Sequence, residues 1–445
     1  MIEVSWGRFE MNVKSGERWQ THERRESWPP YTYREYPEVT VENIRAFTDF
    51  LKTENDVGLK MELQPWISFC DSRCTFCYFP NEPFSGEILE KYLGALKREL
   101  KMYAETNYIG TSIFDEVVLG GGSPSVLPPH QLVNLLSFCE ENFNLTEDVM
   151  VKVAGCTHNF DTKKLRAVSD FAKRVGARCT QIDLGVQTFD DPIRKMLNIH
   201  DSADEAVKTI KTVRKLGLYA CIDLMYNLPG ETMDVLRRDV EKAMELGVEG
   251  VDFYALDIRP GTPMEKQVKS GKVPLIGGSN METKMYLEAY KRFKKGGYKP
   301  TGHSRFSRVK EHFTESCCAG WPWAGQLTTG AGCFMGYLGR FSYVNIEPAS
   351  TYISVVAKGA FPIAKLSVDS KRDRMRKVMT RLYIRQPVDK LKFRKEFGEF
   401  PEEAFSEVIE KLTRRGLVAV DDREIRLTET GDLWRYNVAW EFCRS

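Results

Sequence analysis

Strand-like and helix-like segments alternate regularly between about residues 60 and 260, and this alternation constrains the fold more than any other feature. Runs rich in β-branched and aliphatic residues predict strands at 60–66, 115–120, 149–154, 181–187, 220–226 and 251–257. Amphipathic patterns between them predict helices at 87–105, 128–142, 161–175, 203–216 and 231–246. Such alternation implies parallel strands joined by right-handed helical crossovers. We therefore predict an α/β fold whose six units fall short of the eight of a closed barrel.

The two ends of the chain differ from this repeating middle part, which we assign to one barrel-like domain, 56–300. Residues 1–55 are rich in aromatic residues, Arg and Pro, and predict a loop-rich N-terminal extension with one helix at 41–53. Residues 301–370 predict an irregular connecting region that contributes to a substrate pocket. Residues 371–445 show the helix–strand–turn–strand–helix order of a winged-helix-like domain.

Three cysteines lie in the loop that follows the first predicted strand. Cys70, Cys74 and Cys77 have the spacing C-x3-C-x2-C, with no fourth cysteine or histidine in the loop. Three close thiolates suit a [4Fe-4S] cluster, one of whose irons then lacks a protein ligand. An open position of this kind is where catalytic metal sites bind a small molecule. The loop also lies at the carboxyl ends of the strands, where α/β proteins build their sites.

A structural zinc site is the alternative interpretation of these cysteines. Zinc takes four ligands, usually in two pairs, and the nearest further candidates, His130 and Cys139, are distant and form no second pair. The ligand count therefore favours the iron–sulfur cluster. Phe69, Phe76 and Tyr78 flank the cysteines, and we expect them to shield the cluster from water.

Glycines and polar residues end several of the other strands. Gly120, Gly121 and Gly122 end the second strand, and three glycines permit a close approach of the backbone where a plain turn needs only one. The spaced G-x-G-x-x-G dinucleotide motif is missing. Gln187 and Asp223 end later strands and are candidates to bind the hydroxyl and amino groups of a nucleoside. A capping or turn role is the alternative for Asp223.

Composition narrows the location and the partners. The 64 basic and 62 acidic residues nearly cancel, and acidic residues flank the basic stretch 371–377, so we do not expect nucleic acid as a partner. No apolar run approaches the ~20 residues of a membrane helix. The start of the chain lacks the apolar core of a signal peptide, so we expect a cytoplasmic protein without membrane contact. Its 11 cysteines are an odd number and argue against a disulfide framework.

Taken together, the motifs resemble one enzyme family. "CDSRCTFCYF", "GGGSPS", "LGVQTFDD", "IDLMYNLPGET", "FYALDIRPGTP" and "LTETGDLW" occur in the order seen in the oxygen-independent coproporphyrinogen III oxidase-like branch of radical S-adenosylmethionine (SAM) enzymes. The resemblance is strong over roughly 60–265, moderate over the C-terminal module and slight over 1–55. It implies a partial (β/α)6 TIM-like barrel, a [4Fe-4S] cluster and reductive cleavage of SAM to a 5′-deoxyadenosyl radical.

The resemblance also implies roles for individual residues at matching positions. Cys70, Cys74 and Cys77 would be the cluster ligands. The implied SAM contacts lie on the cysteine loop and at the strand ends, and they are Phe76, Gly121, Gly122, Gln187, Asp223 and Ala255. Phe76 would contact the adenine and the two glycines the SAM amino group. The last three would line the ribose and adenine pocket.

Several positions depart from the true coproporphyrinogen oxidases. Phe79 stands where they have a further cysteine, and Gln64-Pro65-Trp66 replaces their Tyr-x-His. "AGCT" (154–157) replaces "EANP" and removes a SAM-binding glutamate, and Asn198 replaces an arginine. The pattern is closer to relatives that use two SAM molecules, namely class C methylases and anaerobic haem-degrading enzymes. We therefore predict two SAM molecules and transfer of a SAM-derived methyl or methylene carbon to an unsaturated or aromatic carbon.

The substrate pocket is expected to draw on residues 303–337. Trp321, Trp323 and Phe334 are candidates to stack a flat aromatic or tetrapyrrole, although the tryptophans would equally serve to close the open side of the barrel. Four residues of this stretch are candidate proton donors, thiol hydrogen donors or axial haem ligands, namely His303, Cys317, Cys318 and Cys333.

Two other functions remain open besides carbon transfer. One is anaerobic tetrapyrrole chemistry, either haem ring opening or coproporphyrinogen-type oxidation, and the other is a haem chaperone. The fold serves all three functions. For the enzymatic functions we expect a low-potential electron donor such as flavodoxin or ferredoxin.

Overall fold

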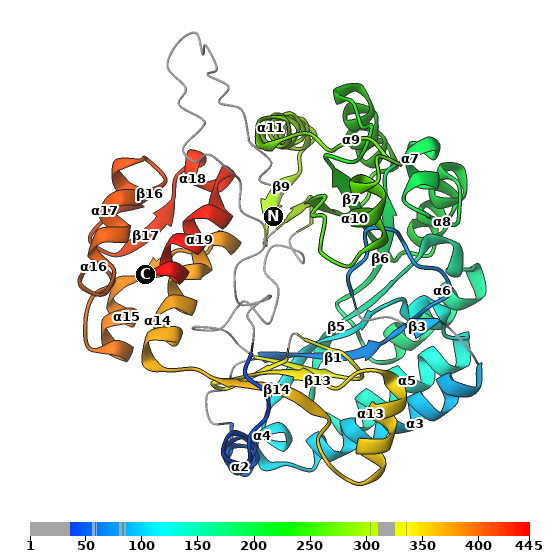
Figure 1. Cartoon of the computed structure of the whole chain (residues 1–445). Coiled ribbons are helices and arrows are strands. Elements are labelled where there is room, and N and C mark those ends of the chain that lie inside the picture. The colour runs from blue at the N-terminus through cyan, green and yellow to red at the C-terminus, as the bar shows by residue number, and fades with distance from the viewer. Residues whose placement is uncertain are drawn as a thin grey trace.

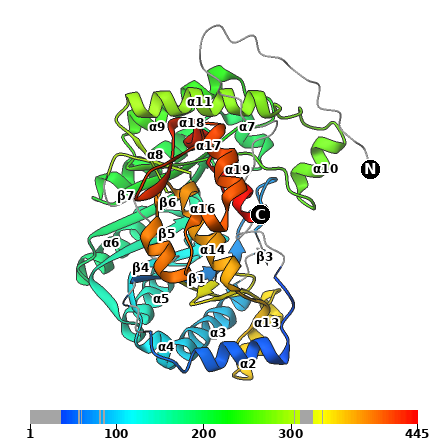
Figure 2. The same ribbon diagram turned by 90° about the vertical axis from the view of Figure 1, so that its left-hand side faces the viewer.

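The computed structural model describes residues 36–55, 58, 60–79, 82–83, 86–302, 304–309, 325–334 and 336–445. In this part of the chain a curved twelve-stranded sheet is covered by helices on its outer side (Figure 1). A C-terminal module lies against one side of the sheet and faces the viewer in Figure 2. The predicted α/β fold is confirmed.

Six parallel strands form the middle of the sheet and follow one another in chain order. They are β1 (Lys60–Ile67), β4 (Ile113–Gly121), β5 (Leu145–Gly155), β6 (Cys179–Gln187), β7 (Tyr219–Tyr226) and β8 (Gly250–Ala255). Each neighbouring pair is parallel, as the βαβ pattern predicts. All six predicted strands are therefore present in the predicted order, as a barrel that is not closed by its own units.

The predicted helices are present as well. The crossover helices are α3 (Gly86–Ala104), α5 (Pro129–Asn142), α6 (Thr162–Arg174), α8 (Ala203–Lys215) and α9 (Met233–Leu246), and α2 (Val41–Phe50), α4 (Asn107–Gly110) and α11 (Ser279–Lys295) complete the set. Ser202 and Glu205 form a capping box that starts α8. Gly247 ends α9 in the left-handed conformation, with φ 63°. None of the helices described combines the length and the apolar character that crossing a membrane requires.

Besides the four-residue α4, two other short helices of the barrel were not predicted from the sequence, α7 (Asp191–Met196) and α10 (Pro263–Lys269). Each begins at an N-cap residue, Asp190 or Thr262, whose side chain accepts a hydrogen bond from a backbone N–H of the first turn, and a proline follows in that turn. They are too short to show a helical period. Both lie beside the cysteine loop, as described below.

The connecting region, expected to be irregular, instead adds strands to both edges of the sheet. They are β9 (Lys299–Thr301), β10 (Arg305–Ser307), β11 (Gln326–Thr329), β12 (Gly336–Leu338), β13 (Phe341–Asn345) and β14 (Ile363–Val368), with α13 (Ala349–Ala357) before the last. β11 pairs in parallel with β1, and β10 pairs antiparallel with β8. The expectation of an irregular region was wrong because several of these strands are very short. β9, for example, has three residues, which is too few for an alternating pattern to be visible.

A buried carboxylate joins these added strands to the barrel. Glu99 of α3 is fully buried and accepts hydrogen bonds from the Tyr352 hydroxyl at 2.6 Å, Asn345 Nδ2 at 2.7 Å and the Gly330 N–H at 2.8 Å. Burial raises the pKa of Glu99 from 4.5 to about 7, against the three donors, which lower it. One side chain therefore connects α3, the loop after β11, β13 and α13.

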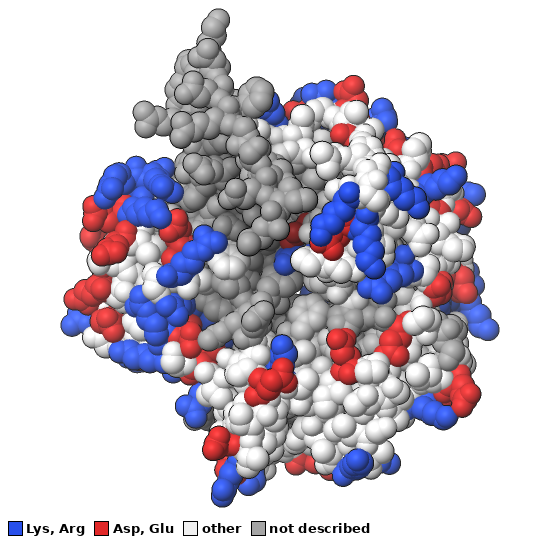
Figure 3. All heavy atoms as spheres, in the orientation of Figure 1, with Lys and Arg blue, Asp and Glu red and all other residues white. Residues whose placement is uncertain are grey.

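The C-terminal module has the predicted winged-helix order. Its helices are α14 (Lys371–Thr380), α15 (Lys390–Phe397), α16 (Pro401–Ala404), α17 (Ser406–Arg414), α18 (Glu429–Leu433) and α19 (Arg435–Arg444). The strands β15 (Val388–Asp389), β17 (Glu424–Leu427) and β16 (Val418–Val420) form a separate antiparallel sheet in that order. Basic and acidic side chains are interspersed over this module (Figure 3). Within the basic stretch 371–377, Arg374 pairs with Glu396 and Lys377 with Asp369.

We predict that Glu99 makes stability fall as the pH rises. Because its pKa is higher in the folded chain, the native state binds more protons than the unfolded state between pH 4.5 and about 7. The free energy of unfolding should therefore decrease across this window, by on the order of 3 kcal/mol from this group. Urea unfolding at a series of pH values should show that Glu99→Gln loses this part of the dependence, whereas Glu105→Gln at the exposed end of α3 keeps it. An unfolding free energy difference between wild type and Glu99→Gln that does not vary with pH would contradict the prediction.

Candidate active site

The three motif cysteines lie together at the carboxyl edge of the parallel strands. Cys70 ends the short strand β2 (Phe69–Cys70), which pairs with β3 (Glu82–Pro83), and Cys74 and Cys77 follow in residues 70–77, here called the cysteine loop. All three side chains are half-buried. Burial is the main cause that raises the pKa of the Cys70 and Cys74 thiols. Both thiols would therefore release a proton on binding a metal.

Backbone hydrogen bonds hold the middle of the cysteine loop against the two short helices. The Thr75 N–H donates to the carbonyl oxygen of Leu197, just after α7, at 2.9 Å. The Thr75 carbonyl oxygen accepts from the N–H of Met264 in α10 at 2.8 Å. Asn198 Nδ2 donates to the Arg73 carbonyl oxygen at 2.8 Å, from a residue with φ 58°, where Asn is well tolerated. Asn198, which replaces the family arginine, thus supports the loop.

The glycines at the end of β4 allow the close backbone approach that the sequence predicts, and the chain they approach is the start of the cysteine loop. The Gly122 N–H donates to the Ile67 carbonyl oxygen at 2.7 Å. A Cβ on Gly122 would lie 2.8 Å from the Phe69 oxygen and 3.1 Å from Cys70 Sγ. Gly121 has φ 112°, and a Cβ there would lie 2.7 Å from the Ile67 oxygen. No other residue type fits at these two positions.

A fourth cysteine lies next to the cysteine loop, and the sequence analysis did not assign it a role. Cys156 follows β5, and its N–H donates to Ser123 Oγ at 3.2 Å and to Ser125 Oγ at 3.1 Å. After burial, the Cys156 thiol is the largest influence that raises the pKa of Cys70 and Cys74. Cys156 belongs to the "AGCT" segment, but nothing in the spacing of the sequence indicates that it lies beside the cysteine loop.

Inside the barrel, Asp223 is one of three neighbouring carboxyl groups. In the parallel register Asp223 lies between Gly185 on β6 and Asp252 on β8. Arg305 donates to Asp252 through Nε at 2.8 Å and Nη2 at 2.6 Å. Burial, and then the charges of Asp252 and Asp183, raise the pKa of Asp223 well above its usual range, while Arg305 opposes the shift. Both effects favour the neutral acid form of Asp223, which can donate a hydrogen bond as well as accept one.

Gln187 and Asp223 lie on the same face of the sheet, as expected for a shared pocket. Gln187 ends β6 with φ 67°, a conformation that is unfavourable for a non-glycine residue and is typical of functional sites. Its amide folds back over Gly185, where a Cβ would lie 3.1 Å from Gln187 Nε2. Gly185 is also the strand neighbour of Asp223. The two polar residues therefore flank one glycine.

The other two predicted nucleoside contacts lie at the strand ends. Phe76 is partly buried against a small apolar cluster. The cluster includes Met225 near the end of β7, Leu256 just after β8 and Met264 of α10. The cysteine loop is thus joined to these strand ends by apolar packing. Ala255 ends β8, but its side chain packs against the main core, so its backbone is the part that borders the edge of the strand.

An aromatic wall stands beside the cysteine loop. Trp66 lies 5.8 Å from Phe79 and 5.4 Å from Phe334 between ring centroids, and Phe79 lies 5.5 Å from Phe334. These three rings are called the aromatic wall below. Trp66 Nε1 is buried and has no hydrogen-bond partner among the described residues. The predicted involvement of Phe334 in the pocket region is consistent with this placement.

Tyr92 fixes the wall to the barrel. The Tyr92 hydroxyl donates to the Trp66 carbonyl oxygen at 2.7 Å and accepts from the Ala331 N–H at 3.1 Å. Ser68 Oγ donates to the Ala331 carbonyl oxygen at 2.6 Å. Phe69, expected to shield a cluster, instead packs edge-on against Tyr92 in the core, with 5.0 Å between centroids. The loop after β11 is therefore held at the end of β1.

Of the candidate haem ligands and hydrogen donors, only Cys333 lies in the described part of the chain. It is fully buried, and its Sγ lies 3.4 Å from the Thr328 carbonyl oxygen. Burial raises the pKa of Cys333 well above its usual range. Cys333 thus lies in the core, and its role as a ligand or hydrogen donor stays a prediction. The other residues named for this pocket lie outside the described residues, namely His303, Cys317, Cys318, Trp321 and Trp323.

The donor set fits a cluster better than a single ion. Among the described residues, no three His, Cys, Asp or Glu side chains converge as the ligands of one metal ion would. This does not support the zinc alternative, because zinc gathers four ligands tetrahedrally around one centre. A [4Fe-4S] cluster spreads three thiolates over three separate irons. Half-buried thiols spread along one anchored loop match that requirement.

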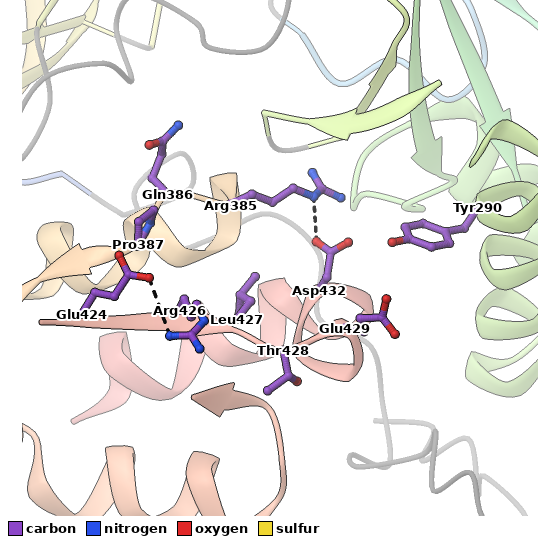
Figure 4. Close-up of a pocket in the computed structure, with 10 residues that line it drawn as sticks. All are labelled: Tyr290, Arg385, Gln386, Pro387, Glu424, Arg426, Leu427, Thr428, Glu429 and Asp432. Atoms are coloured by element: carbon purple, nitrogen blue, oxygen red, sulfur yellow. Dashed lines mark ion pairs between the residues drawn. The ribbon is translucent and has the colours of Figure 1, made fainter. Parts of the chain in front are cut away.

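A second hollow lies between the C-terminal module and α11 (Figure 4). It measures about 350 Å³, and its lining includes Tyr290, Arg385, Arg426, Glu424 and Asp432. Its charges pair with each other, Arg385 with Asp432 at 2.7 Å and Arg426 with Glu424 at 3.7 Å. None of the residues considered for the cluster or for SAM lines it, so it is separate from the candidate active site.

Comparisons with known proteins identify the family. The chain matches the model of the radical SAM superfamily over residues 65–243 and that of the HemN C-terminal domain over residues 369–434. It is 25% identical to an anaerobilin synthase of Escherichia coli O157:H7 over 84% of this chain and 81% of that protein. It is also 25% identical to the heme chaperone HemW of Bacillus subtilis, over 82% of this chain and 95% of that protein.

A solved structure shows the same fold. The coproporphyrinogen III oxidase HemN from Escherichia coli superposes with a TM-score of 0.77 at 19% identity, over 92% of this chain and 94% of that chain. From the two matched domains, the relatives aligned along most of the chain and the shared fold, the protein belongs to the HemN-like branch of the radical SAM superfamily, whose cofactors are a [4Fe-4S] cluster and SAM.

Proposed function

We propose that this radical SAM enzyme transfers a SAM-derived methyl or methylene carbon to an unsaturated carbon of a flat conjugated molecule, with a tetrapyrrole as the substrate class. The aromatic wall beside the cysteine loop carries this proposal. Trp66 is buried behind Phe79 and Phe334, with ring centroids 5.4 to 5.8 Å apart, and the two partly exposed phenylalanine rings can offer an apolar contact to a conjugated ring. The named functions of the anaerobilin synthase and HemW relatives favour a tetrapyrrole.

The cysteine loop supplies the cluster ligands in this proposal. Cys70, Cys74 and Cys77 hold three irons, and the bound cluster serves to cleave SAM reductively to a 5′-deoxyadenosyl radical. The backbone bonds of Thr75 fix the middle of the loop, and the close approach of Gly122 fixes its start. Thiols held in this way need little rearrangement to bind a cluster.

The strand ends supply the SAM pocket. Gly121 and Gly122 expose backbone groups for the SAM amino group, and Phe76 packs where an adenine ring would extend the apolar cluster. Gln187 and Asp223 flank Gly185 and offer an amide and a neutral acid to the ribose hydroxyls. The backbone of Ala255 completes the pocket at the end of β8.

The aromatic wall also supports carbon transfer over coproporphyrinogen decarboxylation. Trp66 stands where the oxidases have a histidine and Phe79 where they have a further cysteine, so neither position carries a titratable group. The aromatic wall can contact the substrate and exclude water, but it cannot relay a proton. We propose that a second SAM molecule lies beside the substrate as the carbon source, and that flavodoxin or ferredoxin supplies the electron.

Haem ring opening is the second candidate reaction. The alignment over 84% of this chain with a protein named anaerobilin synthase favours it, and it shares the same first steps. Storage or delivery of haem, as the HemW name describes, is the alternative without turnover. Products formed from labelled SAM separate these functions.

The cluster ligands are tested by replacing all three cysteines. Anaerobically reconstituted wild type should hold about four irons and four sulfides per chain. The variant with Cys70→Ala, Cys74→Ala and Cys77→Ala should hold none, because too few thiolates remain in the loop. Iron and sulfide assays together with visible absorbance measure the loss, and Cys443→Ala in α19 serves as the matched control. Stoichiometric zinc without iron in the wild type would exclude the cluster.

The role of Asp223 is tested with two substitutions. Asp223→Ala should weaken SAM binding by about 1–3 kcal/mol, because a buried hydrogen-bonding partner is removed. Asp223→Asn should bind SAM nearly as wild type does, since an amide donates and accepts as a neutral acid does. Anaerobic titration calorimetry on cluster-loaded protein gives both values, with Asp204→Ala on the exposed face of α8 as the control. Unchanged affinity in Asp223→Ala would remove the residue from the pocket.

The reaction itself is tested with SAM deuterated in its methyl group and haem as the probe substrate. Because a second SAM held within reach of the radical places its methyl group next to the 5′ carbon, deuterium should appear in 5′-deoxyadenosine and a labelled carbon in the product. Mass spectrometry of both products measures this. If 5′-deoxyadenosine carries no deuterium, hydrogen is taken from the substrate and carbon transfer is wrong. Tight haem binding without 5′-deoxyadenosine would instead indicate a chaperone.

A further inference from the structure

Cys156 is clamped between the cysteine loop and the loop that follows β4. On one side its N–H binds the hydroxyls of Ser123 and Ser125 at 3.2 Å and 3.1 Å. The Ser123 N–H in turn donates to the carbonyl oxygen of Phe69, the residue before Cys70, at 2.8 Å. Cys156 and Cys70 therefore lie on either side of one serine.

On the other side, the turn that follows Cys156 binds the residue after Cys70. His158 Nε2 lies 2.8 Å from Asp71 Oδ2, and Asn159 Nδ2 donates to the same oxygen at 3.0 Å. These residues belong to η2 (Thr157–Asn159), whose first residue donates through Oγ1 to Asp201 at 2.6 Å. The Cys156 segment is thus fastened directly to the start of the cysteine loop.

The segment has little freedom to move away. A Cβ on Gly155 would lie 2.1 Å from Ser125 Oγ, so this backbone packs against the serine loop with no room for a side chain. Cys156 itself is half-buried, whereas Cys139, a packing cysteine of α5, is fully buried. Cys156 is therefore held beside the cysteine loop and not among the apolar side chains of the core.

Three further thiols surround this position. Cys70, Cys74 and Cys77 all lie close enough to Cys156 for their charges to interact, although Cys156 comes from a different strand. Burial also raises the pKa of Cys156 to about 11, with Ser123 opposing the shift through a hydrogen bond. The cluster proposed above leaves one iron without a protein ligand. Cys156 is the nearest thiol outside the cysteine loop for which the structure shows such contacts.

We infer that Cys156 is a displaceable fourth ligand of the cluster: its thiolate binds the open iron while SAM is absent and leaves when SAM arrives. This inference rests on the proposed function of the cysteine loop. The exchange involves no oxidation or reduction. The iron–sulfur bond to Cys156 breaks, the SAM amine and carboxylate bind the iron, and the released Cys156 thiolate takes up the proton lost by the SAM ammonium group and becomes a thiol. The exchange thus caps the open iron before SAM binds.

Capping lowers the apparent affinity for SAM in a calculable way. If about nine in ten clusters are capped, the apparent Kd is about tenfold weaker than that of the uncapped site. Cys156→Ala should therefore bind SAM about tenfold more tightly than wild type. If Cys156 had a purely structural role, Cys156→Ala would bind SAM more weakly than wild type or equally well. The direction of the change in SAM affinity therefore distinguishes the two roles.

The first experiment compares cluster-loaded wild type, Cys156→Ala and Cys443→Ala by electron paramagnetic resonance after reduction, with and without SAM. Without SAM, the Cys156→Ala spectrum should differ from wild type, and with saturating SAM the two should coincide. Cys443→Ala should match wild type throughout. Identical SAM-free spectra and equal SAM affinity in wild type and Cys156→Ala would overturn the inference while leaving the proposed function intact.

A second experiment needs no substitution at Cys156. Cluster-loaded wild type is treated anaerobically with iodoacetamide, and the peptide that carries Cys156 is quantified by mass spectrometry. Alkylation should be slow without SAM and several-fold faster with SAM, because displacement frees the thiol. A rate that SAM does not increase would overturn the inference. Failure of the wild type to assemble any cluster would overturn the proposed function and this inference with it.

Discussion

The end of β4 approaches the end of β1 so closely that no side chain fits between them, and the position of the site depends on this contact. A Cβ at Gly121 or Gly122 would lie less than a van der Waals distance from the backbone of Ile67 or Phe69. The Gly122 N–H bond to the Ile67 oxygen, at 2.7 Å, extends the parallel pairing one residue beyond the strand. Cys70 is fixed by this approach, and Ser123, the next residue along, contacts the Cys156 segment. One backbone contact thus sets the positions of thiols from two different strands.

The interior of the barrel contains more carboxyl groups than it can keep ionised. Asp252 accepts hydrogen bonds from two nitrogens of the Arg305 guanidinium, and Asp183 accepts a hydrogen bond from the Gln181 amide. Asp223 has no cation of its own in the described part of the chain, and its burial among like charges raises its pKa. The neutral form that this favours can donate a hydrogen bond to a ligand as well as accept one.

The sequence predicts the regular part of this structure well, because periodicity and spacing are local properties. The six strands of the barrel follow from apolar runs of up to about eight residues, and their helices follow from amphipathic patterns between those runs. The cysteine spacing indicates the cofactor because all three proposed ligands lie in one short loop and can be counted from the sequence. β9 to β14 could not be predicted, since each is short and is stabilised by pairing with distant strands and by Glu99. The neutral state of Asp223 and the position of Cys156 depend on neighbours from other strands, which no local pattern reveals.

Backbone contacts hold the cysteine loop, and this bears on how a chain can keep its fold while its sequence diverges. Thr75 and Gly122 hold the cysteine loop through backbone groups, so these contacts survive changes in the surrounding side chains. The HemN oxidase structure has this fold with a TM-score of 0.77 at only 19% identity, so the backbone arrangement is kept although most side chains differ. Backbone anchoring allows the position of the cysteine loop to be kept while the side chains around it change.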